Sequence, residues 1–172
     1  MADKALNATA AALLGLLHDG AMTGGQLISA AQQRLGPFWT TTRSQVYREL
    51  PLLAVAGYVR SGEQGPRSAQ PYAITATGRR AFSEWLNEPA GRDQVRNPLL
   101  LRVAFGPLHA DTQLAALYAS QEEDRAARLA ELKAALKEAR REGDPFRIAT
   151  VEFAVTYHKA VLRWLESAPG RR

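Results

Sequence analysis

Side chains suited to hydrogen bonds and phosphate contacts are concentrated between residues 39 and 80. Within an expected helix these are Thr41, Thr42, Arg43, Ser44, Gln45, Tyr47 and Arg48. Gln and Ser side chains hydrogen-bond base edges in the major groove of DNA, and Arg binds guanine or phosphate. Residues 40–80 contain six basic and two acidic side chains, a net charge of +4. The pattern predicts a DNA-contacting helix, with a solvated helix face as the alternative.

A basic loop between two β-prone runs follows this helix. The runs cover residues 58–60 and 72–74, and Gly and Pro in the loop between them are typical of a hairpin. The candidate DNA contacts of this hairpin are Arg60, Arg67, Ser68 and Gln70. A cationic hairpin beside a DNA-contacting helix is suited to the phosphates that flank the groove.

Capping signals place three helices before the hairpin. Asn7 is suited to cap the first of them. Thr23 with Gln26, and Thr42 with Gln45, have the spacing of a capping box, in which the two side chains bond each other's backbone N–H groups. The second and third helices are therefore expected to begin at these two positions, and the third carries the candidate DNA contacts.

A fourth helix is expected after the hairpin, with Thr75 as its cap. Phe82, Trp85 and Leu86 form its expected buried stripe. Three helices, a hairpin and a fourth helix are the elements of a winged helix-turn-helix domain, which we place at residues 1–88. The predicted fold is mainly α with a small β-hairpin.

The second half of the chain is expected to be helical. A long stretch rich in Ala, Leu, Glu and Arg runs from Asp111 to about Arg141, and Asp144 followed by Pro145 is typical of a new helix start. This last helix carries two apolar stripes, Phe146, Phe153, Tyr157 and Trp164 on one and Val151, Val155, Leu162 and Leu165 on the other. A helix that is apolar on two faces must be covered on both. We therefore expect residues 92–168 to form a helical dimerisation domain.

The composition excludes several classes of protein. The 172 residues include no Cys, which excludes disulfides and thiolate chemistry, and three separated His residues predict no metal site. We find no glycine-rich phosphate loop, no catalytic triad pattern and no apolar run of about 18 residues, so we expect no enzyme, no cofactor and no membrane span. The net charge of +5 permits a polyanionic partner. A cytoplasmic protein, nucleoid-associated when bound to DNA, is the simplest interpretation.

Several segments together resemble a known family. Residues 13–17, 23–27, 44–50, 56–59 and 72–82 resemble the DNA-binding domain of PadR-like transcriptional regulators. Residues 101–106 and 145–165 are similar to the C-terminal α domain of its longer, virulence-activator-like members. Pro51 departs from the family, which commonly has a basic or polar residue there, and a proline inside a helix predicts a kink or an early end.

The resemblance implies a homodimer that is held by its C-terminal helices, binds an inverted-repeat operator and usually represses. It puts Ser44, Gln45, Tyr47 and Arg48 on the recognition helix and residues 67–70 at the wing tip. Some relatives respond to phenolic acids or other planar aromatic compounds near the dimer interface. The candidate residues for such an effector, or for the interface itself, are Phe153, Tyr157, Val161 and Trp164.

Two functions from different classes fit these residues. The first is a one-component transcription factor whose partners are double-stranded DNA, a second copy of the chain and a small aromatic effector. The second is a winged-helix module whose basic face binds an acidic protein partner. Because the second function requires no recognition of bases, binding that depends on DNA sequence distinguishes the two.

Overall fold

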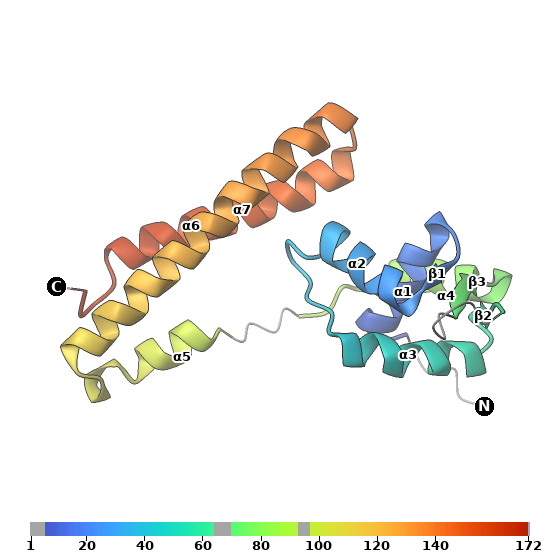
Figure 1. Ribbon diagram of the computed structural model, residues 1–172, viewed down its shortest axis with the longest axis horizontal. Helices are drawn as coiled ribbons and strands as arrows, with labels where there is room; N and C mark the ends of the chain where they lie inside the picture. Colours follow the sequence, from blue (N-terminus) through green and yellow to red (C-terminus); the bar gives the residue numbers. More distant parts are fainter. Residues whose placement is uncertain (1–5, 64–69, 93–96, 172) are drawn as a thin grey trace. The chain divides into compact units, whose positions relative to one another are not determined.

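The computed structural model describes residues 6–63, 70–92 and 97–171 (Figure 1), which form two compact units that divide between Gly91 and Arg92. The fold is mainly α-helical with one small antiparallel sheet, as predicted. The first unit contains α1 (Ala8–Leu16), η1 (Leu17–Asp19), β1 (Met22–Thr23), α2 (Gly24–Arg34), α3 (Arg43–Val55), β2 (Val59–Ser61), β3 (Pro71–Ile74) and α4 (Ala76–Leu86).

The predicted caps of the first unit are present. The Asn7 side chain accepts a hydrogen bond from the N–H of Ala10 at the start of α1. Complete capping boxes begin α2 and α3, at Thr23 and Thr42 respectively. Each cap satisfies backbone N–H groups that the first turn of a helix leaves without a partner. The positions of the three helices therefore follow from local sequence.

The sheet has three strands in the order β1-β3-β2. Val59 pairs with Ile74 between β2 and β3, so the two flanks of the predicted hairpin form as expected. Strand β1 pairs with the other edge of β3, with Met22 opposite Tyr72, and was not predicted. Strand β1 thus connects the hairpin to the segment that leads into α2.

One apolar core holds the first unit together. Its buried residues come from α1, α2, α3 and the sheet and include Leu13, Leu14, Leu27, Leu50 and Ile74. These side chains are the apolar faces that the helical periodicity indicated. Since α3 buries only one face in this core, its opposite face is left exposed.

Pro51 does not end α3, which continues to Val55. A proline there removes the N–H that would donate to the carbonyl of Tyr47, at a cost of about 3 kcal/mol in a helix interior. Leu50 and Leu53 on either side are almost completely buried, and burying each stabilises by about 1.5–3 kcal/mol. The packing of α3 therefore outweighs the lost hydrogen bond, and of the two alternatives, a kink or an early end, the early end does not occur.

The predicted buried stripe of α4 is only partly correct, since Phe82 packs against the core of the unit but Leu86 does not. Leu86 is 61% exposed, and Phe82 and Trp85 are only partly buried. The residue that α4 buries fully is Gly78, which lies against the backbone of Tyr58 at the start of β2. The helix thus contacts the sheet through a residue without a side chain, and its aromatic face borders a hollow.

The second unit consists of helices. These are α5 (Pro98–Ala104), η3 (Gly106–Leu108), α6 (Asp111–Glu142) and α7 (Pro145–Glu166). Gly143, in a left-handed conformation with φ 75°, ends α6, and Asp144 and Pro145 begin α7, as predicted. The helices α6 and α7 lie side by side as an antiparallel pair (Figure 1).

The apolar stripe of α7 that faces α6 is buried. Val151 and Val155 pack against Leu129 and Leu132. At the other end of the pair, Leu165 packs with α5 and the start of α6. One of the two predicted stripes is thus covered within the chain, and the short helix α5, which was not predicted, covers part of it.

Candidate nucleic-acid interface

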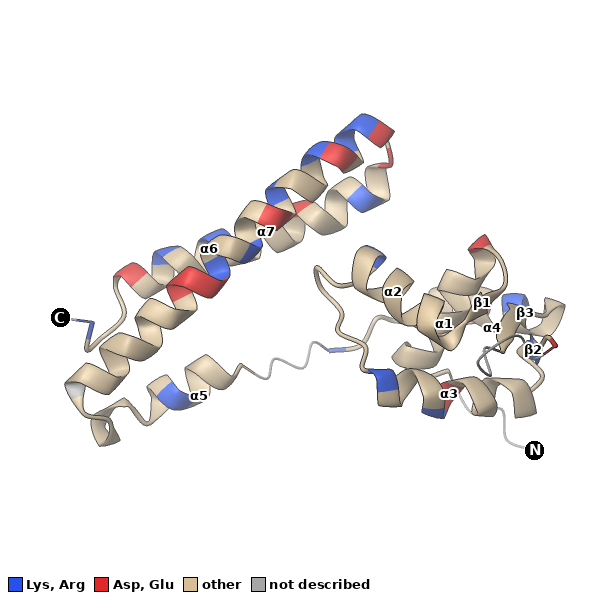
Figure 2. Cartoon of the chain, in the orientation of Figure 1, with Lys and Arg blue, Asp and Glu red and all other residues tan. Residues whose placement is uncertain are grey.

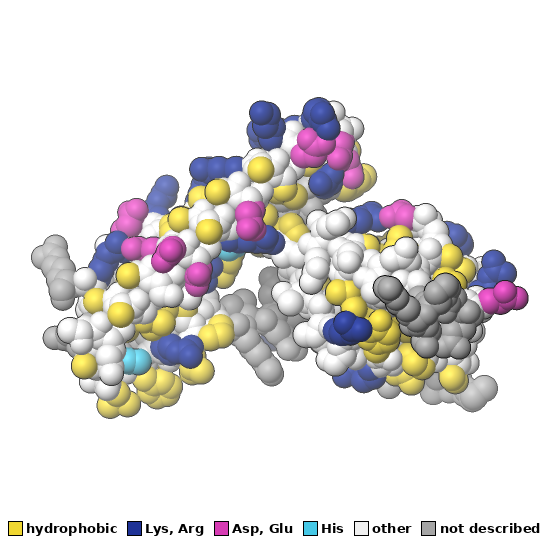
Figure 3. Space-filling model, viewed as in Figure 1, with side chains coloured by type: hydrophobic (Ala, Val, Ile, Leu, Met, Phe, Trp, Pro, Cys, Tyr) yellow, Lys and Arg dark blue, Asp and Glu magenta, His cyan; other side chains and the backbone are white. Residues whose placement is uncertain are grey.

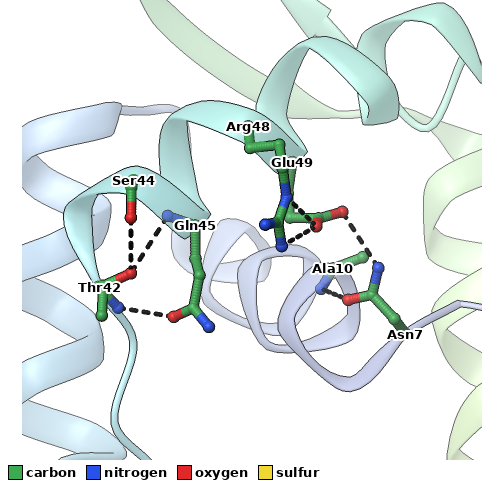
Figure 4. A network of polar contacts seen from close by, with 7 residues as sticks. All are labelled: Asn7, Ala10, Thr42, Ser44, Gln45, Arg48 and Glu49. Atoms are coloured by element: carbon green, nitrogen blue, oxygen red, sulfur yellow. Dashed lines mark hydrogen bonds and ion pairs between the residues drawn. The ribbon is translucent and has the colours of Figure 1, made fainter.

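The first turn of α3 presents polar side chains held by its cap. Thr42 Oγ1 accepts from the N–H of Gln45 at 3.3 Å, and the Gln45 Oε1 accepts from the N–H of Thr42 at 2.8 Å (Figure 4). The Ser44 hydroxyl lies 3.0 Å from Thr42 Oγ1. The cap occupies the amide oxygen of Gln45 and leaves its NH₂ group without a partner among the described residues. Two-point recognition of adenine by Gln45 would require this capping box to open.

Arg48 makes an ion pair that sequence reasoning missed. Its Nε and Nη2 donate to Glu49 Oε1 at 3.3 and 3.0 Å, and Asn7 Nδ2 donates to Glu49 Oε2 at 3.1 Å (Figure 4). Glu49 is only 5% exposed, whereas the Arg48 side chain is 66% exposed. A buried carboxylate must be paired, and Arg48 and Asn7 supply that pairing. Arg48 therefore neutralises Glu49 and keeps Nη1 available at the surface.

Arg43 is the cation of α3 without an ion pair among the described residues. Its guanidinium lies over the ring of Tyr47, with Cζ 5.4 Å from the ring centroid. Tyr47 in turn packs on the start of α2, where a Cβ on Gly24 would lie 2.8 Å from the ring. The close approach to a glycine fixes the ring between α2 and α3. The ring thus supports Arg43 and leaves its charge at the surface.

The predicted hairpin contacts are only partly described. Arg60 is exposed on β2, and Gln70 Oε1 accepts from the hydroxyl of Tyr72 at 3.4 Å. Arg67 and Ser68 lie outside the described residues. Thr41 is half-buried, and its hydroxyl has no partner within the described part of the chain. The contacts of all these residues with DNA, and those of the site residues on α3, remain predictions.

Charge is distributed differently in the two units. In Figure 2, basic positions mark the start and middle of α3, and an acidic position lies beside the second of them. The acid there is Glu49, which is buried and paired, so the exposed surface of α3 keeps a positive charge. On α6 and α7 both signs are interspersed (Figure 2). Of the described elements, α3 is the better suited to a phosphate backbone.

The candidate effector or interface residues of α7 do not share one environment. Val161 and Trp164 pack in the cluster with α5 and α6. Phe153 is 67% exposed and Tyr157 is 43% exposed, and neither belongs to that cluster. The first two contribute to the fold of this unit, and the other two present aromatic rings to the surface.

His158 lies beside these exposed rings. Burial, and then the positive charges of Arg125 and Arg128, lower the pKa of His158 from its ordinary value, because each disfavours the protonated ring. The Arg125 guanidinium also lies 5.8 Å from the centroid of the Tyr157 ring. The middle of α7 therefore combines aromatic rings with fixed positive charge.

Within the described ranges, no three His, Asp or Glu side chains lie close enough to hold a metal ion. None of the helices described is long and apolar enough to cross a membrane.

Helices α2 and α3 form a helix-turn-helix, and the sheet beside them supports a hairpin, so the first unit is a winged helix-turn-helix. Residues 13–84 match the Transcriptional regulator PadR-like family, and residues 95–170 match Virulence activator alpha C-term. Together the two matches cover most of the chain, so both of its units resemble those of PadR-like transcriptional regulators, and the similar proteins are regulators and not enzymes.

Similar proteins agree with this family over nearly the whole chain. The Negative transcriptional regulator PadR of Bacillus subtilis is 27% identical over 169 residues, which are 91% of this chain and 92% of the relative. The structure of Bacillus subtilis PadR in complex with operator DNA is 25% identical, with a TM-score of 0.79 over 94% of this chain and 96% of that one. Its complex with p-coumaric acid is 24% identical, with a TM-score of 0.71 over 94% and 96% of the two chains.

Proposed function

We propose that this regulator is a homodimer that binds an inverted-repeat operator and represses transcription. The observation that carries the proposal is the exposed first turn of α3, where hydroxyls and Arg43, which has no ion pair among the described residues, lie on a capped helix end. A helix of this kind enters the major groove of DNA in helix-turn-helix proteins. Repression is supported by the Bacillus subtilis relative, which is a negative transcriptional regulator.

Different residues of α3 have different proposed roles. Arg43 and the Nη1 of Arg48 bind phosphate or guanine, because they are exposed cations. Ser44 and the free NH₂ of Gln45 contact base edges. The Tyr47 hydroxyl reaches a phosphate, because its ring is held on α3 against the start of α2. Arg60 and the wing residues bind the flanking backbone.

The dimer is proposed to form through the second unit. Phe146, Phe153 and Tyr157 follow one face of α7 and are 83%, 67% and 43% exposed, while the other apolar face of this helix is buried. Apolar side chains also gather on the surface over α5 and the turn that follows (Figure 3). The exposed residues there are Leu100, Leu101, Phe105 and Leu108. Large apolar surface of this extent marks an interface in soluble proteins, and two-fold pairing matches an inverted repeat.

An effector is the third part of the proposal. The relative with 27% identity is Bacillus subtilis PadR, and its structure was also solved in complex with p-coumaric acid. We propose that a small aromatic molecule likewise relieves repression by this chain. It acts by binding one arrangement of the two DNA-binding units more tightly than the other.

The test is a titration of the full-length protein into a labelled duplex from immediately upstream of its own gene. A scrambled duplex serves as the control, and both are measured at two salt concentrations. We expect tight binding to the upstream duplex only, weakening with salt because counterions are released. Binding that is equally weak for both duplexes, and stays so when the titration is repeated with duplexes from the flanking promoter regions, would favour the protein-interaction module.

The proposed interface is tested by Phe153→Asp. A charge placed in an apolar interface is expected to weaken the dimer by about 2–4 kcal/mol, while the fold of the single chain is kept because the side chain is exposed. Sedimentation velocity measures the monomer fraction. Ala134→Asp introduces the same charge on the exposed side of α6, away from Leu132, and is expected to leave the dimer intact. An unchanged dimer in Phe153→Asp would contradict the interface.

A further inference from the structure

Arg48 and Glu49 are neighbours in α3, and their side chains nevertheless meet. Consecutive residues of a helix point in directions about 100° apart, so their side chains do not normally face each other. Here the exposed Arg48 side chain bends back toward the buried Glu49, and its Nε and Nη2 donate to Glu49 Oε1 at 3.3 and 3.0 Å. The direction of the exposed guanidinium is therefore set by a buried carboxylate.

This carboxylate is itself held by the start of the first helix. Asn7 Nδ2 donates to Glu49 Oε2 at 3.1 Å, and Asn7 Oδ1 accepts from the N–H of Ala10 at 2.9 Å (Figure 4). One Asn side chain thus caps α1 and also fixes the second oxygen of Glu49. A polar network in which both oxygens of the carboxylate have partners favours a single arrangement of its members.

The contact with Glu49 leaves the outer edge of the guanidinium free. A guanidinium has five N–H groups, and the bonds to Glu49 use one on Nε and one on Nη2. Nη1 makes no hydrogen bond within the described part of the chain, and the side chain is 66% exposed. Arg reads guanine through two parallel N–H groups, which donate to O6 and N7 in the major groove. The free edge of Arg48 offers such a pair.

The ion pair also decides between a base and a phosphate. Nη2 of Arg48 lies 3.0 Å from the Glu49 carboxylate, so the two charges largely cancel at the distance of a DNA phosphate. Attraction to phosphate depends on net charge and is weakened more by this pairing than a directional hydrogen bond is. Arg43 has no ion pair among the described residues and keeps its full charge. The two arginines of α3 therefore suit different parts of the DNA.

We propose that Arg48 reads one guanine in each half-site of the operator, and that Glu49 and Asn7 are the positioning residues that orient its guanidinium. This inference rests on the proposed function and names a base for it. A guanidinium that is fixed before binding has little rotamer freedom left to lose on contact with DNA, unlike a free Arg side chain. Glu49 and Asn7 touch no DNA and act through Arg48.

The test begins with the duplex that the full-length protein enriches from a random-sequence pool. Each guanine of this duplex is replaced in turn by 7-deazaguanine, which lacks the N7 acceptor, or by hypoxanthine, which keeps both N7 and O6. We expect one position in each half-site where 7-deazaguanine weakens binding about tenfold and hypoxanthine has little effect. Arg48→Lys keeps the charge but has no planar fork, so 7-deazaguanine at that position should no longer weaken binding.

Asn7→Ser tests the positioning role without changing a buried side chain. Serine caps a helix as well as asparagine does, but it is too short to reach Glu49. The penalty for 7-deazaguanine is therefore expected to shrink about threefold, because Arg48 is less firmly held. Asn97→Ser makes the same exchange at the cap of α5 and should leave the penalty unchanged.

Glu49→Gln gives a readout that a purely structural role would not change. Without the carboxylate, the charge of Arg48 is no longer cancelled. The slope of log K against log salt should therefore become steeper by up to about 2 for the proposed dimer, while the penalty for 7-deazaguanine falls. A loss of structure alone would weaken binding without making it more dependent on salt.

Circular dichroism verifies that each variant is folded, and Asn7→Ser decides if Glu49→Gln is not. If no sequence is enriched from the pool, the chain is not a sequence-specific DNA-binding protein, and the guanine contact falls with the proposed function. If a sequence is enriched but no guanine responds to 7-deazaguanine, or the response persists in Arg48→Lys, only the guanine contact of Arg48 is overturned. A response of equal size in the natural chain, Asn7→Ser and Glu49→Gln would overturn the positioning role.

Discussion

Gly78→Ala is expected to destabilise the DNA-binding unit by about 3 kcal/mol or more, which for a unit of this size lowers its melting temperature by roughly 15 °C. A Cβ at this position would lie 2.1 Å from the carbonyl oxygen of Tyr58 and 3.0 Å from Ile74 Cγ1. Backbone cannot yield as a flexible side chain can, so α4 must move away from the sheet. That movement also disturbs Thr75, whose hydroxyl donates to the carbonyl of Gly57 at 2.7 Å and caps α4.

Hydrogen exchange is the measurement that localises this loss. We expect faster exchange of amides in α1, α3 and the sheet, with α6 and α7 unchanged, because the two units have separate cores. Gly25→Ala is the matched control, since a Cβ there meets only the Thr23 hydroxyl at 4.0 Å and alanine favours a helix. Native exchange in Gly78→Ala would mean that α4 does not depend on this contact.

Features set by neighbouring residues were predictable from the sequence. The caps at Asn7, Thr23 and Thr42, and the break at Gly143, depend on side chains within three or four positions. The apolar periodicity of α7 likewise identified the face that packs on α6. In each case the residues that cause the feature lie within one or two helical turns of each other, so residue type and spacing are sufficient to predict it.

Features set by distant residues were missed or wrong. Strand β1 is two residues long and exists because it pairs with β3, far along the chain. Glu49 is buried and accepts a hydrogen bond from Asn7, 42 positions earlier, a contact that the sequence around Glu49 did not indicate. The exposed Leu86 shows that periodicity identifies an apolar face but not whether anything covers it.

Among the candidate DNA-contacting residues, the sequence likewise predicted the local features and missed the long-range ones. Sequence identified the helix, the residue types and the capping box of Gln45, yet it treated Arg43 and Arg48 as equivalent cations and did not follow what the cap means for base contacts by Gln45. The folded chain distinguishes them, because Arg48 is paired with Glu49 and the Gln45 oxygen is part of the cap. Removing Arg48 would therefore change both the surface charge and the stability of α3, and its effect on DNA binding could not be interpreted alone.

Arg43→Ala separates DNA binding from stability. Arg43 has no ion pair within the described residues, so unfolding should change by less than about 0.5 kcal/mol. The proposed dimer would lose two contacts at once, and affinity for the upstream duplex is expected to fall by about 2–4 kcal/mol. If both contacts are to phosphate, the slope of log K against log salt should also become shallower by about 2. Lys137→Ala, which removes the same charge from an exposed position on α6, is the control.

The pattern of these two variants decides what α3 does. Reduced affinity with a shallower salt slope in Arg43→Ala, and neither change in Lys137→Ala, is the result expected of a helix in direct contact with the DNA backbone. A reduced affinity with an unchanged slope would instead assign Arg43 to a base, because base contacts release fewer counterions. Equal behaviour of the two variants would mean that only overall charge matters. In that case α3 would not be the recognition helix, even though the fold is a winged helix-turn-helix.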